Sequence, residues 1–150
     1  MLDLKIDFHG WLLDQAAALR ARDYESLDWD HLAEELELMG ACERRELSSE
    51  LKILLLHLLK LKFQPGQIHR HHSWRNSIVE AREQIADITK DSPGIFQGKC
   101  DDVLAEVYVR ARDKAARESR LPPGTFPETC PWTYDQIIID PDFFPGVTKT

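Results

Sequence analysis

Histidine and arginine side chains gather in the middle of the chain, between positions 69 and 75. Three of the six histidines lie there, in a chain whose formal net charge is −7. Imidazolium and guanidinium groups bind phosphate and other anions, and neutral imidazole binds metal ions. We therefore expect a site for an anion or a partner formed by His69, Arg70, His71, His72 and Arg75.

A metal site is not expected at this segment. Adjacent imidazoles rarely converge on one ion, and zinc needs a third protein ligand that the neighbouring sequence does not supply. Ser73 could cap a helix that begins there, whose free N–H groups would favour an anion. The sequence thus predicts exposed residues 66–72 beside a helix start, with no cofactor and no metal ligand.

Acidic residues upstream suggest a structural role. His31, Glu34 and Glu35 are spaced to share one helix face. Di-iron sites use Glu-x-x-His motifs on two helices, and here only Asp28-x-x-His31 approximates one, with no second copy. We expect Glu34 or Glu35 to pair with an arginine, Arg45 or Arg75, because the first third of the chain is acidic and the centre is basic.

No catalytic residue can be assigned, and the sequence leaves open whether the protein is an enzyme. His57 lies among leucines and is expected to be a hydrogen-bonded core residue. The cysteines, at positions 42, 100 and 130, lack the spacing of a zinc site and have no neighbouring base. Their odd number favours a reducing compartment, so we expect a cytoplasmic protein.

Length and composition indicate one globular domain over residues 1–150, with 43% apolar and 30% charged residues. No run is long enough to cross a bilayer, and the first residues lack the pattern of a signal peptide. The net charge is −7 over residues 1–40, +3 over 41–90 and −3 over 91–150. The basic centre is either a binding face or is neutralised by the chain's own acids.

Helical spacing of apolar residues recurs along most of the chain. A first helix is expected after Asp7 as N-cap, and a second after Asp28 with Trp29 facing inward. Gly40 should end or bend the second helix, and further helices should cover residues 47–58, 74–88 and 103–115. The expected common core comprises Trp29, Leu51, Leu55, Leu58, Trp74, Ile78, Ile85, Leu104 and Val107.

Prolines at positions 122, 123, 127 and 131 predict an extended C-terminal tail, with one short helix over 134–139 capped by Thr133. No alternating pattern of a strand is evident. The sequence therefore predicts an all-α fold: a single bundle of four to five helices with a proline-rich tail.

Four blocks of the sequence lie in a distinctive order. The first is the run from Asp28 to Glu35 with Leu38-Met39-Gly40. The others are Arg45-Glu46-Leu47 with His57-Leu58-Leu59-Lys60 and Gln64-Pro65, then Ser73-Trp74-Arg75 with Ile78, then Phe126–Pro131 with Asp140–Phe143. Together they resemble the bacterial DUF29 family, and the first block resembles its "LDWENLAEEIExLG" signature. The resemblance implies a compact bacterial helical domain of unknown function, and it supplies no catalytic residues.

Two functions remain open at this point. The apolar density around residues 53–61 and the aromatic residues of the tail favour a small cytosolic protein-interaction module with an unidentified protein partner or a second copy. The alternative is a nucleic-acid or nucleotide-binding protein, possibly nuclease-like, that uses the basic His/Arg/Trp centre. No membrane contact is expected.

Overall fold

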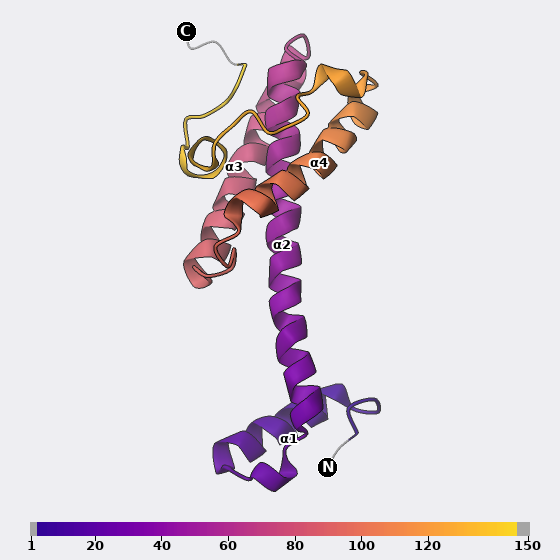
Figure 1. The fold of residues 1–150 in the computed structure, drawn as a ribbon, viewed down its shortest axis with the longest axis vertical. Coiled ribbons are helices and arrows are strands. Elements are labelled where there is room, and N and C mark those ends of the chain that lie inside the picture. The colour runs from indigo at the N-terminus through magenta and orange to yellow at the C-terminus, as the bar shows by residue number, and fades with distance from the viewer. Residues whose placement is uncertain (1–2, 147–150) are drawn as a thin grey trace. The chain divides into compact units, whose positions relative to one another are not determined.

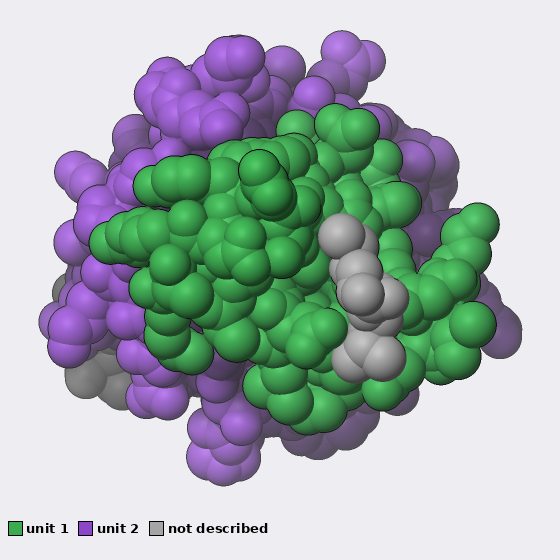
Figure 2. Space-filling view, turned by 90° about the horizontal axis from the view of Figure 1, so that it is seen from below, with its two compact units in different colours: residues 1–42 green, residues 43–150 purple. Residues whose placement is uncertain are grey.

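A computed structural model describes residues 3–146 of the chain. Two compact units divide the chain: unit 1 is residues 1–42 and unit 2 is residues 43–150 (Figure 2). Within residues 3–146 every regular element is a helix and no strand occurs. The expected all-α fold is therefore confirmed.

One long helix, α2 (Trp29–Phe63), contributes residues to both units. It is continuous over 35 residues and does not end at Gly40, where the sequence predicted an end or a bend. A glycine inside a helix costs only about 1 kcal/mol relative to alanine. The leucine, methionine, alanine and glutamate residues around Gly40 are strong helix formers, so the helix continues through it.

Unit 1 combines α1 (Phe8–Ala21), the short η1 (Tyr24–Ser26) and the first part of α2. The carboxylate of Asp7 accepts a hydrogen bond from the N–H of Gly10 at 2.9 Å, which confirms Asp7 as the N-cap of α1. The fully or nearly fully buried side chains of this unit are few: Trp11, Gln15 and Leu27.

Unit 2 packs the later part of α2 against α3 (Ile68–Asp91) and α4 (Cys100–Ser119), and α4 crosses α2 obliquely in Figure 1. Its core contains eight of the nine residues predicted to be buried together, which confirms the helix faces: Leu51, Leu55, Leu58, Trp74, Ile78, Ile85, Leu104 and Val107.

The prediction that the ninth residue, Trp29, belongs to this core is wrong. Its side chain is 59% exposed in unit 1. Its indole is stacked on the ring of Tyr24, with centroids 6.4 Å apart, and Tyr24 is itself exposed. Helical spacing identified Trp29 as part of an apolar face, but no element of unit 1 covers that face.

The start of α3 also differs from the prediction. The helix begins at Ile68, so residues 69–72 are helical, and Ser73 lies inside the helix. Gln67 is the N-cap and makes no side-chain capping bond. Pro65 and Gly66 are the last helix-breaking residues of the segment, and nothing after them prevents an immediate start.

After α4 the chain forms η2 (Pro123–Thr125) and a single π-helical segment, η3 (Asp135–Ile139). The short helix expected near residue 134 is thus present. The hydroxyl of Thr133 accepts from the N–H of Gln136, and the side-chain Oε1 of Gln136 accepts from the N–H of Thr133, as in a capping box.

Candidate functional site

The predicted basic site lies on the first two turns of α3. The side chains of His69, Arg70, His72 and Arg75 are exposed, and His71 is half-buried. They are therefore presented by a regular helix rather than by the loop that the sequence suggested. A helix fixes the spacing of these groups, which a loop would not do.

A cavity of about 430 Å³ lies beside these residues, lined by His71, His72, Arg75, Asn76, Val79 and Phe144. The guanidinium of Arg75 lies 4.6 Å from the centre of the Phe144 ring, within the range of a cation–π contact. The amide nitrogen of Asn76 is 3.4 Å from Nε2 of His72. The cavity therefore offers imidazole, amide and guanidinium groups beside an apolar floor, a combination that suits an anion.

Other members of the basic centre are used inside the fold. Trp74 is only 6% exposed, and its ring lies 5.6 Å from that of His71, so it is not free to stack on a base. The Lys60 ammonium pairs with the Glu118 carboxylate at 2.6 Å. Burial raises the pKa of Glu118, but the hydrogen bond and charge of Lys60 outweigh it and lower the pKa overall. This part of the basic centre is neutralised within unit 2.

Arg82 is a buried arginine that the sequence reasoning missed. Its guanidinium donates hydrogen bonds to the carbonyl oxygens of Gln136, Ile137 and Phe143 at 3.0, 2.8 and 2.8 Å. Burial lowers its pKa, and the charge of Asp140 acts in the opposite direction. A signal was present: Arg82 continues the four-residue spacing of Trp74 and Ile78, where an apolar residue is expected.

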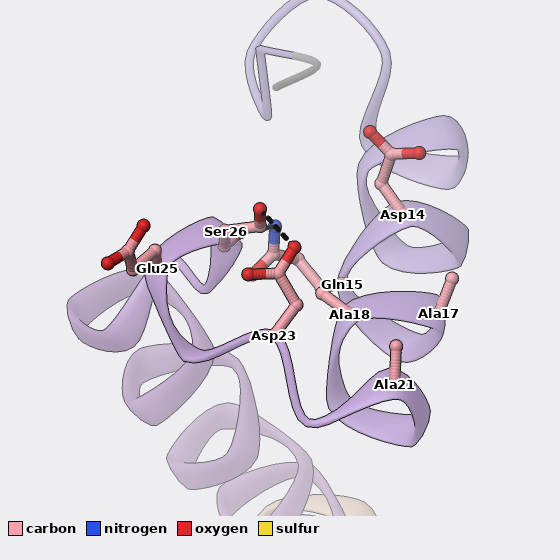
Figure 3. Close-up of a pocket in the computed structure, with 8 residues that line it drawn as sticks. All are labelled: Asp14, Gln15, Ala17, Ala18, Ala21, Asp23, Glu25 and Ser26. Atoms are coloured by element: carbon pink, nitrogen blue, oxygen red, sulfur yellow. Dashed lines mark hydrogen bonds between the residues drawn. The ribbon is translucent and has the colours of Figure 1, made fainter.

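In unit 1, the buried amide of Gln15 connects α1 to the residues before α2. Its nitrogen donates to the carbonyl of Ser26 at 3.2 Å, and its oxygen accepts from the N–H of Asp28 at 2.7 Å. Figure 3 shows Gln15 reaching toward Ser26 at the side of a polar cavity of about 570 Å³. The carboxylates of Asp14, Asp23 and Glu25 also line this cavity, which makes it acidic.

Asp28 and His31 form a hydrogen-bonded pair next to this connection, with Nδ1 of His31 2.7 Å from the carboxylate, and it is an ion pair when His31 is protonated. The hydrogen bond to His31 lowers the pKa of Asp28, and the same bond raises the pKa of His31. The Trp11 side chain also lowers the pKa of Asp28, although its buried indole N–H has no hydrogen-bond partner among the described residues.

The predicted pairing of Glu34 or Glu35 with Arg45 stays a prediction. Glu34 is exposed and Glu35 is half-buried, both in unit 1, whereas Arg45 is an exposed residue of unit 2. The structure therefore gives the surroundings of each side chain separately and does not test the pair.

Apolar side chains on the surface distinguish unit 1. Fifteen large apolar side chains are exposed among residues 3–146, five in unit 2 and ten in unit 1. The ten are Ile6, Phe8, Leu12, Leu13, Leu19, Tyr24, Trp29, Leu36, Leu38 and Met39. Exposed apolar surface on this scale is typical of a protein interface.

Several other sources of chemistry find no support in the described residues. Burial raises the pKa of the Cys100 and Cys130 thiols, which disfavours a reactive thiolate. His57, half-buried, places Nδ1 2.7 Å from the carbonyl of Ile53, as a structural histidine does.

Within residues 3–146, no three histidine, cysteine or acidic side chains are grouped to hold a metal ion. No helix of this part is long and apolar enough to cross a membrane.

Comparison with known proteins gives a family and nothing further. No curated protein and no solved structure matches the chain. The family model described as "Domain of unknown function DUF29" matches residues 5–144, which include most of both units and the basic segment of α3. On that match, the chain belongs to the DUF29 family.

Proposed function

We propose that this protein is an interaction module that binds a partner protein through unit 1. The observation that carries the proposal is the ratio of covered to uncovered apolar side chains in that unit. Trp11 and Leu27 are the buried apolar residues of its described part, against ten large apolar residues that are exposed. A segment of about 40 residues rarely buries enough surface to be stable alone, so a partner would supply the missing cover.

The uncovered residues include a regular face of α2. Trp29, Ala33 and Leu36 are exposed and follow one another at intervals of four and three residues. That spacing places them on one side of the helix. We call Trp29, Ala33 and Leu36 the apolar face of α2, and it is the surface on which a partner helix would pack.

Site-specific photocrosslinking tests the proposal. A photoreactive residue would replace Leu36 in one full-length variant and Ile68 in another, since both side chains are highly exposed, at 67% and 75%. In cells that make the protein, we expect an adduct from position 36 that is absent from position 68. The protein in that adduct, purified separately, should bind the wild-type chain and lose about tenfold in affinity against Leu36→Gln. Equal adducts at both positions, or undiminished binding by Leu36→Gln, would reject the proposal.

A second candidate function is the binding of a phosphate group or nucleic acid at the start of α3. It is supported by the exposed side chains of His69, Arg70, His72 and Arg75 and by the adjacent cavity. Binding of a labelled oligonucleotide should be measurable at low salt, because exposed basic side chains pair with phosphate groups. It should also weaken with salt, and Arg75→Gln should bind less tightly. Binding that is absent at low salt, or undiminished in Arg75→Gln, would exclude this function.

We propose the cytoplasm as the location. Cys42, Cys100 and Cys130 are all free thiols, and none is paired in a disulfide. Free cysteines are typical of reducing compartments. Labelling of all three thiols in protein taken directly from cells, without added reductant, is the expected outcome.

A further inference from the structure

We infer that the partner segment on the apolar face of α2 is a helix with lysine or arginine residues flanking its apolar side. The inference rests on the proposed function of unit 1 and adds the chemistry of its partner. The juxtaposition that carries it is an uncovered apolar face on a stretch of chain that holds no basic residue except a histidine.

The charge of this stretch is one-sided. Between Arg22 and Arg44 the chain has no lysine and no arginine. The same stretch holds eight acids: Asp23, Glu25, Asp28, Asp30, Glu34, Glu35, Glu37 and Glu43. A neutral apolar partner would therefore exclude water from the rim of the interface, where these carboxylates lie. It would supply no positive charge to pair with them.

These carboxylates are largely without cations in unit 1. Among its described residues, the one ion pair joins Asp28 to His31. Asp30, Glu34 and Glu37 are exposed and adjoin the apolar face in sequence. Removing unpaired carboxylates from water costs free energy that a partner's cations would offset. Complementary charge also accelerates association and rejects partners of the wrong sign.

A second copy of unit 1 is a poor occupant for the same reason. Residues 1–40 carry ten acids and three bases, a net charge of −7, and two copies would bring like charges together. The dimensions instead suit a short helix. The distance along α2 from Trp29 to Leu36 is roughly 10 Å at about 1.5 Å per residue, or about two turns. Helix-in-groove recognition commonly uses contacts over such a length.

Two synthetic amphipathic peptides test the inference on the full-length protein. They share one leucine face, and the polar face is lysine in one peptide and glutamate in the other. Fluorescence anisotropy should show one-to-one binding of the leucine–lysine peptide and at least tenfold weaker binding of the leucine–glutamate peptide. Raising salt from about 0.1 M to about 1 M should weaken the former, because exposed charges are then screened.

Matched variants separate docking on this face from general attraction to an acidic protein. Leu36→Gln should weaken leucine–lysine binding about tenfold, and Ile68→Gln should not change it. For charge, the double variant E34Q/E37Q should lose affinity, whereas E80Q/E83Q should not. The control pair has the same spacing, is equally exposed and lies on α3.

Each other outcome overturns the inference. Equal binding of both peptides would show that charge does not select the partner, and the proposed interaction function would still stand on its crosslinking test. Undiminished binding by Leu36→Gln would mean non-specific attraction. Absence of binding by either peptide would remove the docking face. Sedimentation that shows a dimer in the wild type and a monomer in Leu36→Gln would assign the face to a second copy.

Discussion

Unit 1 and unit 2 are built from the same kind of amphipathic helix, and they differ in how much of it they cover. Unit 2 buries a continuous core of 22 apolar residues from α2, α3, α4 and the C-terminal segment. Unit 1 buries Trp11 and Leu27, and ten of its large apolar side chains are exposed. One helix, α2, supplies leucines both to the buried core of unit 2 and to the exposed surface of unit 1.

The difference suggests a division of labour. A region that covers its own apolar residues gains stability from them, because burial of each leucine or isoleucine contributes about 1.5–3 kcal/mol. In a region that leaves them exposed, the same free energy of burial is gained only when a partner covers them. Unit 2 would then serve as the stable part and unit 1 as the binding part.

The largest expected effect distinguishes two leucines of the same helix. Leu55 is fully buried and Leu36 is 67% exposed. Leu55→Ala should lower the free energy of unfolding by about 2–5 kcal/mol, because it leaves a cavity. Leu36→Ala should change it by less than about 0.5 kcal/mol. Urea denaturation measures both, and similar losses in the two variants would break the comparison between the units.

A comparable loss is expected at Arg82, which holds the C-terminal segment to unit 2. Arg82→Met keeps the aliphatic stem but leaves three carbonyl oxygens without their donor, at a total cost of about 3 kcal/mol in unfolding free energy. Arg75 contacts the same Phe144 ring from an exposed position and provides the control. Arg75→Met should cost less than about 1 kcal/mol. Equal losses of unfolding free energy in the two variants would show that the three hydrogen bonds of Arg82 do not stabilise the fold more than the contact of Arg75 does.

A smaller and local effect is expected in unit 1. Gln15→Leu removes the two hydrogen bonds to Ser26 and Asp28. We expect faster amide hydrogen exchange over residues 8–28, equivalent to a decrease of about 1–2 kcal/mol in the free energy of local opening. Exchange in the core of α3 should not change. Gln84→Leu, at an exposed position of α3, is the control and should leave unit 1 unaffected. A uniform acceleration over the whole chain would show that the units do not open separately.

The smallest expected effect is the pH dependence of stability, to which one histidine of each unit contributes with opposite sign. The Asp28 hydrogen bond raises the pKa of His31, so its contribution is complete below the ordinary value near 6.5 and is lost as pH rises through the raised pKa. Burial lowers the pKa of His57, so unit 2 loses stability as pH falls below about 6.5 toward the lowered pKa.

Acidification from about pH 8 to about pH 6 should therefore protect unit 1 and weaken unit 2. NMR titration of both imidazoles, with exchange rates at each pH, measures the two trends. His31→Gln should abolish the trend in unit 1, and His57→Gln the trend in unit 2. Shifts of equal sign for the two imidazoles would contradict this contrast.

Much of unit 2 could be predicted from residue spacing. Leu51, Leu55 and Leu58 face inward because a helix of 3.6 residues per turn places them on one side, whatever covers them. The N-cap role of Asp7 and the helix near Thr133 were equally accessible, since both depend on bonds between residues three apart. Local bonding of this kind needs no knowledge of the rest of the fold.

The candidate sites were only partly predictable. The sequence predicted a site at His69, Arg70, His71, His72 and Arg75, and the structure adds that a helix presents these side chains. It did not identify Arg82 as structural, because the three carbonyl groups that accept its hydrogen bonds lie 54 to 61 residues away along the chain. Contacts over such separations depend on how the helices pack.

The sequence by itself determined that the chain is helical, which side of each long helix is apolar, and that the first third is acidic. These follow from periodicity and composition, which are local properties. Only the tertiary structure decided which apolar sides are covered. Leu58 and Trp29 belong to the same helix and both lie on an apolar face, yet the first is fully buried in the core of unit 2 and the second is exposed. Burial depends on neighbours far along the chain, and the spacing of residues within one helix does not specify them.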